Sequence, residues 1–148
     1  MVKHVIRTAF TAGAIVVTVA VSNAVTIAGQ QPSAASVFTA EQAAAGKPEF
    51  LKTCAACHMP DLGGNNEVPQ LAGVSFRTAW SERTTKDLLD YMSANMPPNG
   101  SSLTAETYVS IAAFILESNG AVAGEKKLTA STAVAIASLI PARSAAKN

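Results

Sequence analysis

The feature that most constrains this chain is a run of five residues, Cys54-Ala55-Ala56-Cys57-His58. Cys-x-x-Cys-His is the sequence at which a c-type haem is attached covalently. Each thiol can add to one vinyl group of the same porphyrin, and the next residue then lies where its imidazole can bind the iron. The motif therefore predicts one covalently attached haem c, with Cys54, Cys57 and His58 binding the cofactor and His58 binding its iron.

Three other uses of the two cysteines fit the sequence less well than haem attachment. A thioredoxin-like redox pair belongs in a βαβ setting, and no alternating β-rich run surrounds residues 50–65. A zinc site needs further ligands, but the only other histidine is His4, near the N-terminus. A disulfide between Cys54 and Cys57 would close a very short loop and leave the following histidine unused.

The composition favours an all-α fold. The chain has 148 residues, which is enough for one domain with tails, and it is rich in alanine, a strong helix former. Hydrophobic residues make up 49% of the sequence but aromatic residues only 5%. A buried haem would supply the large apolar surface that the side chains lack.

Residues 1–28 have the pattern of a secretory signal peptide. A short positive segment is followed by a long uncharged, apolar stretch, and small residues fit cleavage after Ala24 or Ala28. The stretch is also nearly long enough to span a bilayer, so an uncleaved anchor in the inner membrane is the alternative. Periplasmic export agrees with haem attachment, which takes place outside the cytoplasm in bacteria.

Cleavage would remove Lys3 and Arg7, two of the eleven basic residues, and leave nine against ten acidic ones. Two haem propionates would make the mature protein more acidic. Nucleic acid is therefore not an expected partner.

Residues 29–37 form a flexible lead-in, and Thr39 begins a capping box for a helix over 40–52. Pro48 predicts a kink or a break near Gly46 and Lys47, and Gly46 predicts a close crossing with another helix.

Further along, the glycines and asparagines of residues 61–73 indicate a loop. Helical spacing of apolar residues predicts a helix from Thr85 to Asn95. A last helix is expected from Thr104, its N-cap, to Ser118.

Residues 38–120 resemble the monohaem class I cytochromes c. The similarity rests on Gly46, Phe50, the Cys54–His58 motif, Pro69-Gln70-Leu71-Ala72-Gly73 and Met96-Pro97-Pro98. Residues 95–98 and 108–116 are similar to small cytochromes c associated with bacterial quinoprotein dehydrogenases. The resemblance implies a few helices around one haem, with terminal helices that cross where Phe114 lies near Gly46 and Phe50.

The resemblance also implies contacts around the haem. The backbone carbonyl of Pro69 is expected to accept a hydrogen bond from His58, which would fix the imidazole tautomer. Trp80 has two interpretations, as a core aromatic residue or as an indole N–H donor to a haem propionate. Arg77 and Arg83 are either solvated charges or propionate partners.

The sixth iron ligand is expected to be a methionine. Met59 adjoins His58 and cannot reach the opposite face of the ring, and Met92 lies within a helical run, where a core role is simpler. Met96 ends that run, and the two prolines after it hold the backbone extended. Met96 is therefore the predicted ligand, with Met92 as the alternative.

A filled coordination shell favours single-electron transport over catalysis, so the chain is not expected to be an enzyme in itself. The alternative is a haem enzyme subunit or a gas or ligand sensor with an exchangeable sixth ligand. Redox proteins are the expected partners, such as a quinoprotein dehydrogenase and a terminal oxidase or another cytochrome of a respiratory chain. Residues 121–148 are expected to be a weakly ordered C-terminal extension.

Overall fold

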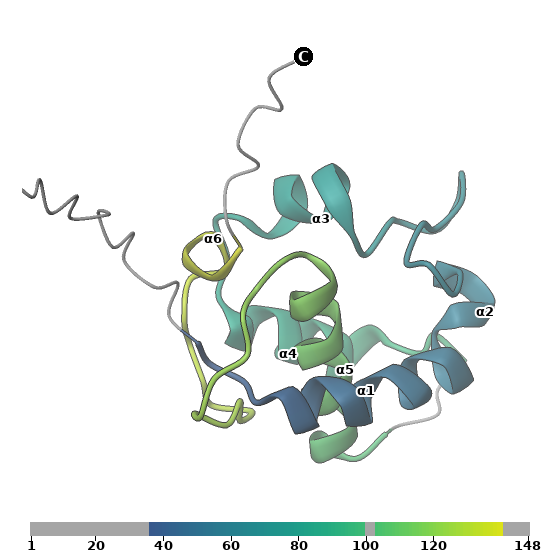
Figure 1. The fold of residues 1–148 in the computed structure, drawn as a ribbon. Helices are drawn as coiled ribbons and strands as arrows, with labels where there is room; N and C mark the ends of the chain where they lie inside the picture. The colour runs from purple at the N-terminus through teal and green to yellow at the C-terminus, as the bar shows by residue number, and fades with distance from the viewer. Residues whose placement is uncertain (1–35, 100–102, 141–148) are drawn as a thin grey trace, which may run out of the picture. The chain divides into compact units, whose positions relative to one another are not determined.

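Residues 36–99 and 103–140 are the part of the chain that the computed structural model describes, and they are mainly helical (Figure 1). In chain order the helices are α1 (Ala40–Thr53), α2 (Ala55–His58), α3 (Gly73–Trp80), α4 (Thr85–Asn95), α5 (Ala105–Ser118) and α6 (Ile136–Leu139). These ranges contain no β-strand, only an isolated bridge between Thr84 and Ala135. The prediction of an all-α fold is confirmed.

The predicted signal peptide over 1–28 lies outside the described residues, as does nearly all of the lead-in over 29–37. Cleavage or membrane anchoring of that segment therefore stays a prediction. No helix in the described ranges is long and apolar enough to cross a membrane.

Helix α1 begins at the predicted capping box. The Thr39 hydroxyl accepts from the backbone N–H of Gln42 at 3.3 Å, and the Gln42 side chain accepts from the Thr39 N–H at 3.2 Å. The helix then continues through Pro48 to Thr53, so the structure has no break near Gly46. Pro48 and Ala44 are both exposed, and water can therefore satisfy the Ala44 carbonyl that lacks its usual donor.

Helices α1 and α5 cross at Gly46, as predicted. A Cβ atom at this buried glycine would lie only 1.9 Å from the carbonyl oxygen of Ser110. Next to the crossing, the rings of Phe50 and Phe114 are in contact, with centroids 5.4 Å apart. Glycine permits the backbones to approach, and the two aromatic rings fill the adjoining space.

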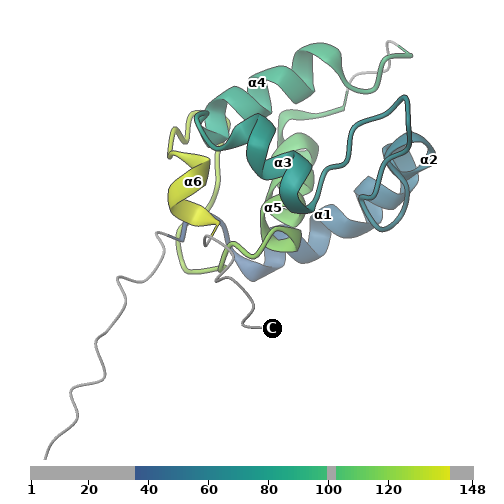
Figure 2. The same cartoon turned by 90° about the horizontal axis from the view of Figure 1, so that it is seen from above.

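Helix α5 forms the centre of the core, and α4 packs against it (Figure 2). The residues of α4 that this packing buries include Leu88, Leu89 and Met92.

Helix α3, which was not expected from the sequence, buries Phe76. The N-cap of α3, Ala72, has no capping side chain. The amide side chain of Asn119, which follows α5, instead accepts from the Gly73 N–H at 2.9 Å.

The structure differs from the sequence expectation over residues 121–140. This segment packs along one side of the domain and buries Leu128, Ile136 and Leu139, each at most 2% exposed. Its large apolar residues lie at irregular intervals in an Ala-, Ser- and Thr-rich background. The sequence therefore has no sustained helical or strand period there that would predict their burial. Residues 141–148 lie outside the described part of the chain.

The crossing predicts the sign of a single substitution. Alanine is normally about 1 kcal/mol better than glycine inside a helix. Gly46→Ala should instead lower the free energy of unfolding by roughly 1–3 kcal/mol or more, because the added methyl overlaps the Ser110 carbonyl. Chemical denaturation measures this change. The exposed control Ala44→Ser should stay within about 0.5 kcal/mol of wild type, and a stabilised Gly46→Ala protein would contradict the crossing.

Candidate functional site

The Cys-x-x-Cys-His motif forms a single helical turn at the end of α1. Cys54 is both the C-cap of α1 and the N-cap of α2. Its carbonyl accepts from the backbone N–H of Cys57 at 3.1 Å and of His58 at 2.9 Å. Met59 has a positive φ of 64°, unusual for a residue with a side chain, and ends the turn. Two thiols and an imidazole are thus presented from one short element.

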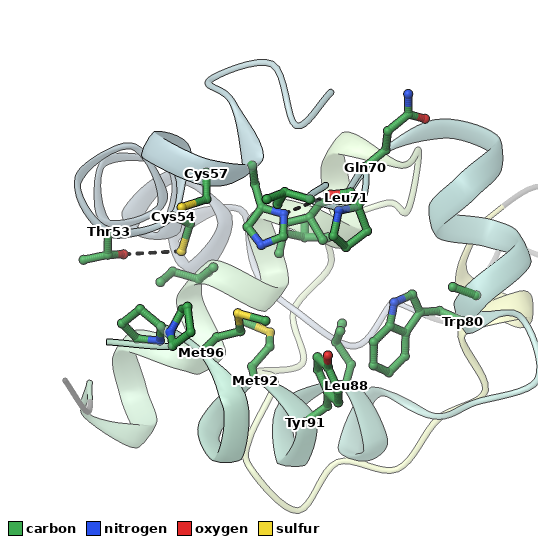
Figure 3. A pocket seen from close by; sticks show the side chains of 18 of the residues that line it. Thr53, Cys54, Cys57, Gln70, Leu71, Trp80, Leu88, Tyr91, Met92 and Met96 are labelled. Atoms are coloured by element: carbon green, nitrogen blue, oxygen red, sulfur yellow. Dashed lines mark hydrogen bonds between the residues drawn. The ribbon is translucent and has the colours of Figure 1, made fainter. Parts of the chain in front are cut away.

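This turn borders a cavity of about 670 Å³ whose surface is mainly apolar. The volume lies within the range of roughly 300–1,000 Å³ that is usual for small-molecule and cofactor sites. Figure 3 shows Cys54 and Cys57 on one wall and Met92 and Met96 on the facing wall. His58 also lines the cavity.

Both cysteines are free thiols. Burial raises the pKa of the Cys54 thiol, and a contact with the Thr53 hydroxyl at 3.4 Å partly opposes this shift. Thioether formation adds one sulfur and one hydrogen across each vinyl double bond, and two free cysteines satisfy that stoichiometry.

The side chain of His58 is held by the following loop. His58 is only 7% exposed, and its Nδ1 lies 2.9 Å from the carbonyl oxygen of Pro69. A carbonyl can only accept, so Nδ1 carries the proton and Nε2 keeps a free lone pair for a metal. The contact expected from the resemblance is present.

Asn119 holds the same loop from the end of α5, a role that the sequence analysis missed. Its amide group donates to the carbonyl of Leu71 at 2.9 Å and accepts from the N–H of Gly73. An asparagine at a helix end gives no indication of a partner 48 residues away.

Met96 leaves helix α4 in the extended conformation that Pro97 and Pro98 predicted, with φ −126° and ψ 139°. Its backbone N–H still donates to the Met92 carbonyl at 2.9 Å. The hydroxyl of buried Tyr108 donates to the Met96 carbonyl. Tyr108 is a second residue whose role at the site was missed.

Trp80 forms another part of the cavity wall, apart from the methionines (Figure 3). Its ring stacks on Phe76 with centroids 6.3 Å apart and meets the ring of Tyr91 edge-on at 5.7 Å. The guanidinium of Arg83 lies 5.2 Å from the Trp80 ring centroid and also borders the cavity. Arg77 is half-buried and is not among the cavity residues.

The residues around the cavity fit a haem c. Two thiols are available for covalent attachment, and an imidazole nitrogen and a thioether sulfur are the donors that bind haem iron in cytochromes c. The apolar lining suits a porphyrin, and Trp80 and Arg83 supply polar hydrogens at the wall.

This combination of fold and site defines a c-type cytochrome. Residues 41–115 match the family model described as cytochrome c oxidase, cbb3-type, subunit III, and the chain belongs to this family. It is accordingly a haem-based electron-transfer protein with haem c as its cofactor. The comparisons with curated proteins and with solved structures each gave no match.

The contact between Tyr108 and Met96 predicts the effect of removing one hydroxyl group. Tyr108→Phe should lower the free energy of unfolding by about 1–2 kcal/mol, because the Met96 carbonyl loses its donor. Denaturation of the haem-loaded protein provides the measurement. Tyr91→Phe is a matched control, since Tyr91 is 46% exposed and should tolerate the change. Equal stability of the two variants would show that the contact contributes nothing.

Proposed function

We propose that this chain is a monohaem class I cytochrome c that carries single electrons in the periplasm. Cys54 and Cys57 would hold the haem, His58 would be the proximal iron ligand and Met96 the sixth ligand. The observation that supports this most directly is that the attachment motif and Met96 border one apolar cavity. The bound haem would supply a one-electron redox centre.

The surrounding residues suit electron transfer. The hydrogen bond to Pro69 orients His58 and makes its other nitrogen a better donor. A thioether opposite an imidazole favours ferrous iron and raises the reduction potential relative to two histidines. With both axial positions filled by side chains, no position would remain for a substrate, and this argues against catalysis.

The proposed donor is a dehydrogenase, and a quinoprotein dehydrogenase is favoured by the resemblance of residues 95–98 and 108–116. The matched family is described as an oxidase subunit, so a terminal oxidase is a candidate acceptor, alongside another cytochrome. Isolation of the protein with its partner, followed by identification of what reduces it, would discriminate among these.

The mass of the mature protein tests cofactor number and export together. After expression with the haem maturation machinery, the intact mass should equal a polypeptide beginning between about Ala24 and Gln31 plus one haem. Acidic acetone should not extract the haem, because two thioethers hold it. A mass without haem would contradict the attachment, whereas Met1 in the membrane fraction would establish an anchor.

The second prediction concerns the sixth ligand. The ferric protein should show the weak near-infrared absorption of an iron–sulfur bond, and the ferrous protein should bind carbon monoxide poorly. Met96→Ala should abolish the absorption and open the iron to carbon monoxide. Met92→Ala, the matched control, should keep the absorption but lose roughly 2–4 kcal/mol of stability, because Met92 is buried.

Two outcomes would contradict this assignment. Loss of the absorption in Met92→Ala but not in Met96→Ala would make Met92 the ligand. A wild-type protein that lacks the absorption and binds carbon monoxide freely would instead favour a sensor or an enzyme with an exchangeable sixth position.

A further inference from the structure

Residues 121–140, here called the C-terminal strap, lie beyond the region that matches the family model. Figures 1 and 2 show the strap passing along the side of the domain to α6, which lies beside α3. One attachment of the strap is near the start of α1. The Gln42 side chain donates to the Leu128 carbonyl and accepts from the Leu128 N–H, both at 2.9 Å.

The second attachment is at the start of α4 and centres on Thr85, which is only 1% exposed. Its hydroxyl donates to the Thr132 carbonyl at 2.6 Å and accepts from the Val134 N–H at 3.2 Å. Its own N–H donates to the Val134 carbonyl at 2.9 Å. A single buried threonine therefore holds the strap through three hydrogen bonds.

The same attachment reaches the cavity wall through Arg83. The Arg83 carbonyl accepts from the N–H of Ile136, the first residue of α6, at 2.9 Å. The Arg83 guanidinium lies over the ring of Trp80, and both side chains border the cavity. Ile136 and Leu139 are buried, and α6 packs against α3, which carries Trp80 at its end. The strap thus holds the connection between α3 and α4 from outside.

We propose that Thr85 and the strap are positioning elements of the haem site, which hold Trp80 and Arg83 at the cavity wall. This inference rests on the proposed function, since it assigns the wall a role toward the haem. The indole N–H of Trp80 and the guanidinium of Arg83 place polar hydrogens on this wall. Their placement contributes to the local field, and such outer contacts tune the potential of a haem iron.

The test compares three variants of the haem-loaded protein. Thr85→Val removes the hydroxyl at nearly constant shape, Thr85→Ser restores a hydroxyl, and Thr78→Val makes the same change at an exposed position of α3. Amide hydrogen exchange reports on the strap, near-ultraviolet circular dichroism on Trp80, the only tryptophan, and a redox titration on the site. Intact mass and near-infrared absorption report on the haem and its ligands.

In Thr85→Val, the Val134 N–H and the Thr132 carbonyl lose the hydroxyl that they contact. The attachment should then open more often, and exchange at the backbone amides of positions 85, 134 and 136 should become roughly tenfold faster or more. The tryptophan signal should weaken and the midpoint potential should shift. Thr85→Ser should recover both signals, and Thr78→Val should match wild type. Haem content and near-infrared absorption should be the same in all four proteins.

Faster exchange with an unchanged tryptophan signal and potential would reduce the strap to a purely stabilising element and overturn the proposal. Unchanged exchange would overturn it as well. If Thr85→Val does not fold, Ile136→Val offers a milder release of α6 from α3 and is judged by the same readouts. Missing haem or absorption in wild type would instead contradict the proposed function, while exchange and dichroism would still test the strap.

Discussion

The arrangement of the site depends on the close contact of α1 and α5 at Gly46. Because the backbones meet there, with the Ser110 carbonyl where a Cβ would otherwise be, the end of α1 is fixed relative to α5. That end leads directly into the Cys54 turn, while Ile111 and Ile115 of α5 border the same cavity. A wider crossing would shift the two thiols relative to the apolar surface that is to receive the haem.

Helix α5 also holds two segments of the site. One carries the proposed ligand Met96, and the other is the loop whose Pro69 supports His58. Near the start of the helix, Tyr108 donates to the carbonyl of Met96. At its end, Asn119 holds the loop whose Pro69 carbonyl accepts from His58. Residues at the two ends of one helix thus hold two different walls of the cavity in place. Such support from outer residues is what keeps ligands oriented in metal sites.

Much of the fold follows from local chemistry in the sequence. Thr39 and Thr104 are short-range caps that act within three residues, and both begin helices as predicted. Gly46 is recognisable because a glycine inside a helix is costly without a packing reason. Helix α3 could not be predicted in this way, because its first N–H is capped by the distant Asn119. The continuity of α1 through Pro48 depends on the exposure of Pro48 and Ala44 to water, which the spacing of apolar residues did not indicate.

The sequence by itself determined the attachment motif, the class of cofactor and the helical fold, because each is encoded in neighbouring residues. Only the tertiary structure decided which distant groups support the site. Thr85 meets Thr132 across 47 residues, and Gln42 meets Leu128 across 86. A hydrogen bond from a side chain to the backbone does not depend on which residue the partner is, since every residue has a backbone carbonyl. They leave no pattern in the sequence and arise only when the chain is folded.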